Sequence, residues 1–121
     1  MTGASIIQHL AIVLLQAASL IHARIEQVRD EPWTYHDRRV RLCGEVTEDR
    51  STLYSDTSSH FHGRVGVKLS GHGVSGRNQC VTGYVRRVDG KGREKASQEL
   101  EVTDAPVRAD YVFVAEQAGS S

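Results

Sequence analysis

The clearest pattern along the chain is an alternation of apolar and polar residues in short runs. The run 40–46 (VRLCGEV) places Val40, Leu42, Gly44 and Val46 on one face, and the run 64–69 (RVGVKL) does the same with its valines and leucine. Successive side chains of a strand point to opposite faces, so each run predicts a half-buried strand. The run 80–88 predicts another, and 53–55 (LYS) begins a short one.

The segments between these runs predict turns and loops. Residues 70–78 (SGHGVSGRN) contain three glycines and predict a connection with no room for a long helix. After a charged loop at 89–97, we expect the last strand at 99–102, with Leu100 and Val102 inward. Residues 111–114 then form either a further edge strand or an extended tail, and 116–121 a flexible tail.

Two strand runs share a glycine at the same place. The sequence Leu42-Cys-Gly44-Glu-Val46 matches Val81-Thr-Gly83-Tyr-Val85 position for position. A glycine inside a strand marks a bulge or a tight bend, as a closing barrel requires. Before these strands, the spacing of Ile25 and Val28 predicts a short helix that Pro32 ends, and Trp33 or Tyr35 is expected to cover one end of the barrel.

The N-terminal segment is apolar and has no formal charge from Ser5 to Ala23. Its apolar stretch 10–15 and the small Ala23 before Arg24 favour a secretion signal removed at that point. The first five residues lack the basic residue of a typical signal, and Gln8, His9 and Gln16 make the segment more polar than a transmembrane helix requires. The alternatives are an uncleaved anchor or interfacial helix, and a helix packed on the protein's own barrel. The expected domains are therefore 1–23, 24–115 and the tail 116–121.

The run Ile25-x-x-Val28-x-x-x-Pro32-x-x-Tyr35, followed by Val40-x-Leu42-x-Gly44-x-Val46, resembles the opening of small bacterial exported OB-fold proteins related to the tRNA-anticodon-binding-like group. The resemblance covers roughly residues 25–102. It implies a mainly β fold, a five-stranded OB-fold-like Greek-key barrel with an N-terminal helix, located in the periplasm or secreted. Such a fold names no ligand, because one fold hosts many functions.

The two cysteines, Cys43 and Cys80, are expected to form a disulfide in an exported protein, whereas in a cytosolic protein they would be two buried thiols. In an OB barrel the first and fourth strands are antiparallel neighbours. Pairing Cys43 opposite Cys80 also sets Leu42 opposite Val81, which keeps apolar residues together on the inner face.

The net charge of the chain gives no strong attraction for a polyanion, because 15 basic residues balance 15 acidic ones. Basic residues nevertheless cluster around one loop and the neighbouring first strand, where an outward tyrosine could stack on a base. This predicted basic patch comprises Arg86, Arg87, Lys91, Arg93 and Lys95, with Arg39, Arg41 and Tyr84 beside it. A solvated charged hairpin remains the favoured interpretation.

Chemistry of other kinds has weaker support. His60, His62 and His72 could form a metal site, but serines and glycines surround them, and we expect solvent-facing, metal-free side chains. Ser70, His72 and Asp56 lack the sequence context of a nucleophile and its base, so we expect no enzyme and no cofactor.

The sequence therefore predicts an exported, non-catalytic OB-fold binding or accessory module that engages a protein, a glycan or an envelope component. The alternatives are a single-stranded nucleic-acid-binding domain, or a structural subunit anchored in an assembly by its N-terminal helix. In the last case the protein would be membrane-associated through residues 5–23.

Overall fold

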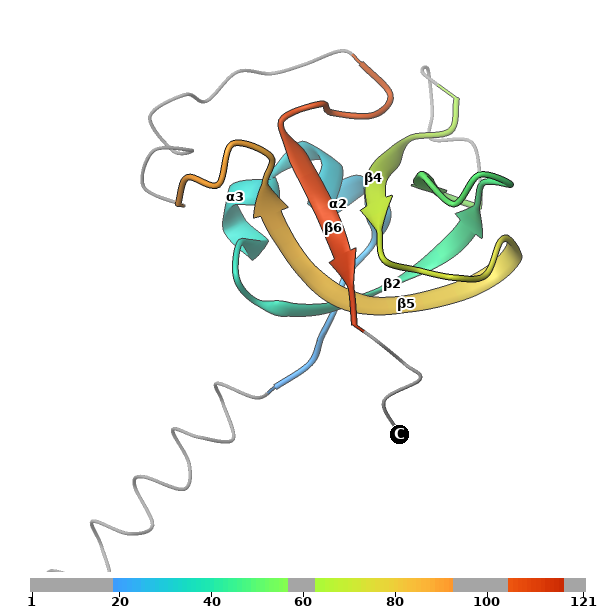
Figure 1. Ribbon diagram of the computed structural model, residues 1–121, viewed down its shortest axis with the longest axis horizontal. Helices are drawn as coiled ribbons and strands as arrows, with labels where there is room; N and C mark the ends of the chain where they lie inside the picture. Colours follow the sequence, from blue (N-terminus) through green and yellow to red (C-terminus); the bar gives the residue numbers. More distant parts are fainter. Residues whose placement is uncertain (1–18, 57–62, 93–104, 117–121) are drawn as a thin grey trace, which may run out of the picture.

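The computed structural model describes residues 19–56, 63–92 and 105–116 (Figure 1). In these residues the chain is mainly β, as predicted. The elements in order are β1 (Ile21–His22), α2 (Ile25–Asp30), α3 (Pro32–Tyr35), β2 (Arg39–Val46), β3 (Thr52–Tyr54), β4 (Gly66–Ser70), β5 (Gly76–Arg87) and β6 (Tyr111–Ala115).

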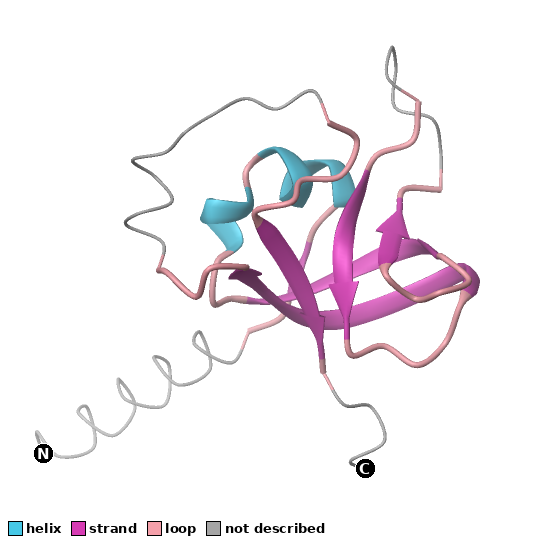
Figure 2. Ribbon diagram, turned by 45° about the horizontal axis from the view of Figure 1, so that its top comes forward, coloured by secondary structure: helices cyan, strands magenta, loops and turns pink. Residues whose placement is uncertain are grey.

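Five of the strands close into a barrel. The sheet order is β1-β2-β3-β4-β6-β5, and β2 pairs again with β5, which closes the sheet on itself. The pairing of β4 with β6 is parallel, and the other pairings within the barrel are antiparallel. β1 is an additional strand, parallel to β2. The arrangement is compatible with an OB-like fold, and Figure 2 shows the two short helices gathered at one end of the barrel.

The alternation read from the sequence determines which side chains fill the barrel. Along β2, Val40, Leu42 and Val46 are buried, while Arg41 and Cys43 are exposed. Val65, Val67 and Leu69 are buried likewise, as expected. The buried apolar residues of β2 and β4 form one hydrophobic core with residues of α2, β3, β5 and β6, and burial of such a core is the main favourable term in folding.

The closing strand differs from the expectation. β6 lies between β4 and β5 and pairs with both, so residues 111–114 are neither an edge strand nor a tail. Its inward side chains Tyr111, Phe113 and Ala115 alternate with outward valines, which is the pattern of a half-buried strand. The strand expected at 99–102 lies outside the described residues.

The helical region is close to the prediction. α2 ends at Asp30, with Ile25 and Val28 buried. Pro32 is also the first residue of α3. At this position a backbone N–H would have no acceptor within the helix, so the missing N–H of proline costs nothing. Trp33 and Tyr35 are half-buried against the core, as expected for residues that cover a barrel end.

The N-terminal segment joins the barrel before Arg24. Ile21 and His22 pair with Val40 and Arg41 of β2, and the N–H of Ala23 donates to the Arg41 carbonyl at 3.3 Å. Ile21 and Ala23 pack against the core. Residues 1–18, where a signal or helix is expected, lie outside the description. In the described ranges no helix has the length and apolar character needed to span a membrane.

The two glycines that the sequence marks as bends, Gly44 and Gly83, stand where backbones approach closely. A side chain at Gly44 would overlap the Tyr54 carbonyl and reach within 2.7 Å of Ile25 Cδ1. One at Gly83 would overlap the carbonyl of Val114. The pairing of β2 with β5 also shifts register beside Gly44, where Glu45 alone stands against Arg77 and Asn78, so the extra residue of this bulge lies in β5.

Candidate functional site

Cys43 and Cys80 form a disulfide, as predicted, with an S–S distance of 2.09 Å. The predicted register is also found, since Cys43 stands opposite Cys80 and Leu42 opposite Val81. Both cysteines are exposed on the outer face of the barrel. A disulfide indicates an oxidising, extracellular-type environment, because cytosolic thiols are kept reduced.

The strand geometry divides the predicted basic patch. Arg86 and Arg87 are consecutive in β5, so their side chains leave opposite faces. Arg86 is exposed on the outer face, where it forms an ion pair with Asp37 and lies over the Tyr84 ring at 5.7 Å. The side chain of Arg87 is only 8% exposed. Arg93 and Lys95 lie outside the described residues.

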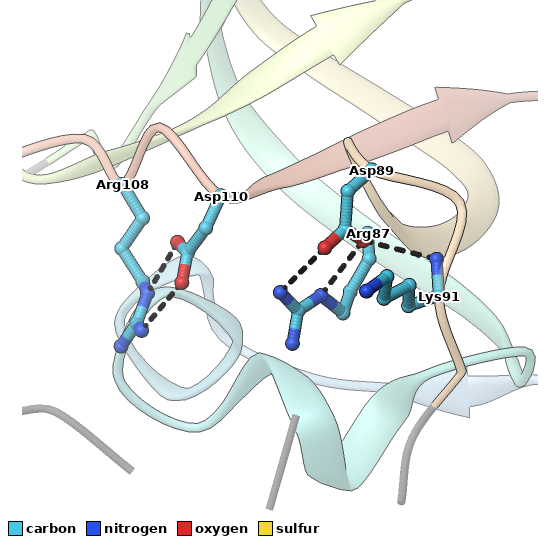
Figure 3. Close-up of polar contacts among 5 residues, drawn as sticks. All are labelled: Arg87, Asp89, Lys91, Arg108 and Asp110. Atoms are coloured by element: carbon cyan, nitrogen blue, oxygen red, sulfur yellow. Dashed lines mark hydrogen bonds and ion pairs between the residues drawn. The ribbon is translucent and has the colours of Figure 1, made fainter. Parts of the chain in front are cut away.

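Arg87 and Lys91 converge on one carboxylate (Figure 3). The Arg87 guanidinium donates two hydrogen bonds to Asp89, at 3.0 and 2.8 Å, and the backbone N–H of Lys91 donates a third at 2.9 Å. The bond from Lys91 is the main reason that the pKa of Asp89 lies below its ordinary value. At the start of the predicted basic loop, Asp89 therefore offsets the charge of Arg87 and holds the backbone of Lys91.

The remaining members of the patch lie on the outer face of β2 and β5. Arg39 stands opposite Tyr84 and donates to both carboxylate oxygens of Glu116, at 2.5 and 3.1 Å. This bidentate pair raises the pKa of Arg39 and lowers that of Glu116. Arg41 is exposed two residues before Cys43 on the same face. The structure thus gathers Arg39, Tyr84 and Arg86, together with acids that offset their charge.

A second arginine pair, not identified from the sequence, lies beside Arg87. Arg108 donates to Asp110 at 3.0 and 2.9 Å (Figure 3), and its guanidinium lies over the rings of Trp33 and Tyr111 at 5.4 and 5.9 Å. The hydrogen bonds from Arg108 lower the pKa of Asp110, and burial raises the pKa of Tyr111. The sequence signal that could have identified this pair is the Arg-x-Asp spacing, which occurs at 87–89 and again at 108–110. These contacts hold the start of β6 at the barrel end.

One polar hollow is lined by exposed and half-buried residues. Its volume is about 460 Å³, within the range of small-molecule sites. It forms where the end of β2, the segments flanking the β3–β4 connection and the start of β5 meet. Its lining consists of Glu45, Asp56, Arg64, Arg77 and Asn78, and we call it the polar hollow.

Arg64 forms a fixed wall of the polar hollow. Its Nε donates to the carbonyl of Ser55 at 2.8 Å, and its guanidinium pairs with Glu45 at 2.6 Å. The guanidinium also lies over the Tyr54 ring at 5.3 Å. Contacts on three sides leave this side chain little freedom.

The other lining groups are held loosely. The Arg77 side chain is 83% exposed, with Nε 3.9 Å from Glu45, and Asp56 and Asn78 are exposed. The hollow therefore presents carboxylates, guanidiniums and an amide together. The sequence did not predict the polar hollow, because no motif joins these residues. A bulge and the two ends of the β3–β4 connection bring them together.

The residues considered for metal binding or catalysis do not assemble into a site in the described ranges. His72 is half-buried rather than solvent-facing, while Ser70 and Asp56 are exposed, and no hydrogen bond joins the three there. No cluster of three or more metal-ligating side chains occurs among the described residues. His60 and His62 lie outside them.

Comparisons with protein-family models, with curated proteins and with solved structures find no match to this chain.

Proposed function

We propose that this chain is an exported, non-catalytic binding module with an OB-like barrel, which engages a glycan or protein of a bacterial cell envelope through its outer face. The observation that carries the proposal is the polar hollow, built from side chains of both charges beside a disulfide-locked seam. OB-type barrels bind ligands across outer strand faces, which makes this the expected place for a site.

Export is supported by the disulfide, and the N-terminal segment supplies a route to the envelope. Cleavage before Arg24 would remove Ile21 and His22 from their pairing with β2. We therefore favour retention of the chain from Ile21 onward. In that case an upstream signal cut, or an uncleaved anchor in the membrane, would place the barrel in the periplasm.

Single-stranded nucleic acid is the weaker alternative. A polyanion site requires basic side chains that are free to neutralise phosphates. Here Arg39, Arg86 and Arg87 each have an acidic partner. Binding a phosphate at these three residues would therefore require breaking existing ion pairs, and an oligonucleotide would approach acids as well as bases.

A co-sedimentation experiment tests the proposed function. The purified full chain would be mixed with the insoluble envelope fraction of its own cell, and we expect it to sediment with that fraction. The double variant Asp56→Ala/Arg77→Ala should remain in the supernatant. The matched control Glu48→Ala/Arg38→Ala removes the same two charges from exposed sites outside the hollow and should sediment like wild type.

Two outcomes would overturn the proposal. One is equal sedimentation of wild type and hollow variant, which would remove the hollow from the interface. The other is salt-dependent binding of wild type to a single-stranded oligothymidylate without binding to the envelope fraction, which would assign the module to nucleic acid.

A further inference from the structure

We infer that the polar hollow binds an uncharged, hydroxyl-rich ligand, that is, one or two units of a neutral saccharide. The inference rests on the proposed function, because it names the ligand class of the site through which the module is proposed to act. Four observations lead to it: the bulge in β5 opposite Glu45, the fixed Arg64, the loosely held groups opposite it, and the balance of charge.

A bulge interrupts the pairing of β2 with β5 at Glu45. Pairing runs from Arg39 to Gly44 and resumes at Val46, opposite Gly76, so Glu45 alone stands against two residues of β5, Arg77 and Asn78. The extra residue therefore lies in β5, and a bulge re-aims the side chains of the strand that carries it. It brings Arg77 and Asn78 to the hollow that Glu45 also lines.

Two hydrogen bonds join the described ends of the β3–β4 connection at Ser55 and Val65. Ser55 is buried, its N–H donates to the Val65 carbonyl at 2.8 Å, and its hydroxyl accepts from the Val65 N–H at 3.3 Å. Asp56 and Arg64 lie immediately beyond this double contact. Because Arg64 is also fixed by Glu45, one wall of the hollow is organised before any ligand arrives, which reduces the entropy lost on binding.

The opposite side of the hollow offers groups with unused hydrogen-bonding capacity. The carboxylate of Asp56 is exposed and has no ion pair within the described residues. Asn78 is exposed and has a φ of 56°, a conformation that asparagine tolerates better than most residues. Its amide both donates and accepts, and the exposed Arg77 guanidinium only donates.

The charge balance selects among ligands. Two carboxylates and two guanidiniums line the hollow, so its formal charge is zero. A polyanion would meet Glu45 and Asp56, and a polycation would meet the two arginines. A sugar hydroxyl can donate to a carboxylate and accept from a guanidinium or amide at the same time, so it satisfies both kinds of group without a net charge.

The experiment compares three trisaccharides of similar size by calorimetry on the full chain: triacetylchitotriose, which is neutral, deacetylated chitotriose, which is cationic, and trigalacturonate, which is anionic. We expect the neutral sugar to bind with a Kd on the order of 10⁻⁴ to 10⁻³ M, and each charged sugar about tenfold more weakly or worse.

Variants locate the binding. Asp56→Ala and Asn78→Gly should each weaken the neutral sugar about tenfold, since each removes a partner of a ligand hydroxyl. Glycine is chosen at position 78 because it accepts the positive φ. Glu48→Ala is the matched control, and it should bind like wild type. Circular dichroism of each variant checks that the barrel is retained.

The outcomes distinguish this inference from the proposed function. Preference for a charged sugar, or equal binding by the hollow variants and wild type, would overturn the neutral-saccharide assignment. If no trisaccharide binds while the chain still sediments with the envelope fraction, the inference falls and the proposed function stands with a protein partner. If the chain binds no trisaccharide and does not sediment with the envelope fraction, both the inference and the proposed function are wrong.

Discussion

Cys43 and Cys80 face each other directly across the antiparallel strands β2 and β5, and their sulfur atoms lie 2.09 Å apart. The bond joins residues 37 apart in sequence, and both cysteines are exposed on the outer face. It therefore secures the seam that closes the barrel without using any volume of the hydrophobic core.

Removing this bond should destabilise the barrel without changing its core. The double variant Cys43→Ala/Cys80→Ala is expected to lose roughly 3 to 4.5 kcal/mol of unfolding free energy, because the unfolded chain regains the freedom of a long loop. Urea denaturation under oxidising conditions measures the loss. Reduced wild type should match the variant, and coincident unfolding curves of oxidised wild type and variant would contradict the prediction.

The success of the register prediction has a local physical basis. Side chains alternate with a period of two, and a one-residue slip would have moved Leu42 and Val81 to the outer face. The glycines at 44 and 83 added a second constraint, since both mark close backbone approaches. Such signals lie within each strand, so they can be read from the sequence.

The features that were missed depend on contacts between distant segments. The sequence of Tyr111–Ala115 alternates as clearly as β2, yet only its pairing with both β4 and β5 makes it the closing strand. β1 is two residues long, too short for any periodicity. The polar hollow joins the end of β2, both flanks of the β3–β4 connection and the start of β5, and its position depends on a bulge with no sequence motif.

Substituting Gly83 should be costly, because its place in β5 leaves no room for a methyl group. A Cβ there would overlap the carbonyl of Val114 in the neighbouring strand β6. We expect Gly83→Ala to lower the unfolding free energy by about 1 to 3 kcal/mol or more. Gly73→Ala is the control, since nothing lies within 4 Å of its added Cβ. Equal thermal midpoints for the two variants would refute the close approach.

Truncation at the expected signal site should damage the barrel. Deleting residues 1–23 removes β1 and uncovers the edge of β2 at Val40 and Arg41. Loss of the half-buried Ile21 and Ala23 from the core is expected to cost about 1 to 3 kcal/mol. Deleting residues 1–18 keeps every described residue and is the control. If both truncated chains unfold at the same urea concentration, β1 contributes nothing to stability.

The Arg108–Asp110 pair should make stability depend on pH in a defined direction. Hydrogen bonds from Arg108 hold the folded-state pKa of Asp110 below its ordinary value of 3.8. A carboxyl with a depressed folded-state pKa contributes stability that is complete above the unfolded-state value and disappears as the pH falls through the folded-state value. Asp110→Asn should therefore be less stable than wild type at pH 7, because it leaves the guanidinium of Arg108 without its charged partner. The side chain of Arg108 is only 8% exposed.

The difference in unfolding free energy between Asp110→Asn and wild type should shrink steadily below about pH 4. Because the side chain of Asp110 is 47% exposed, solvent screening should keep the effect modest. Urea denaturation at a series of pH values measures it, with Glu48→Gln as a control for the loss of one exposed negative charge. A difference between Asp110→Asn and wild type that stays constant from pH 7 to pH 2 would show that the ion pair is not its source.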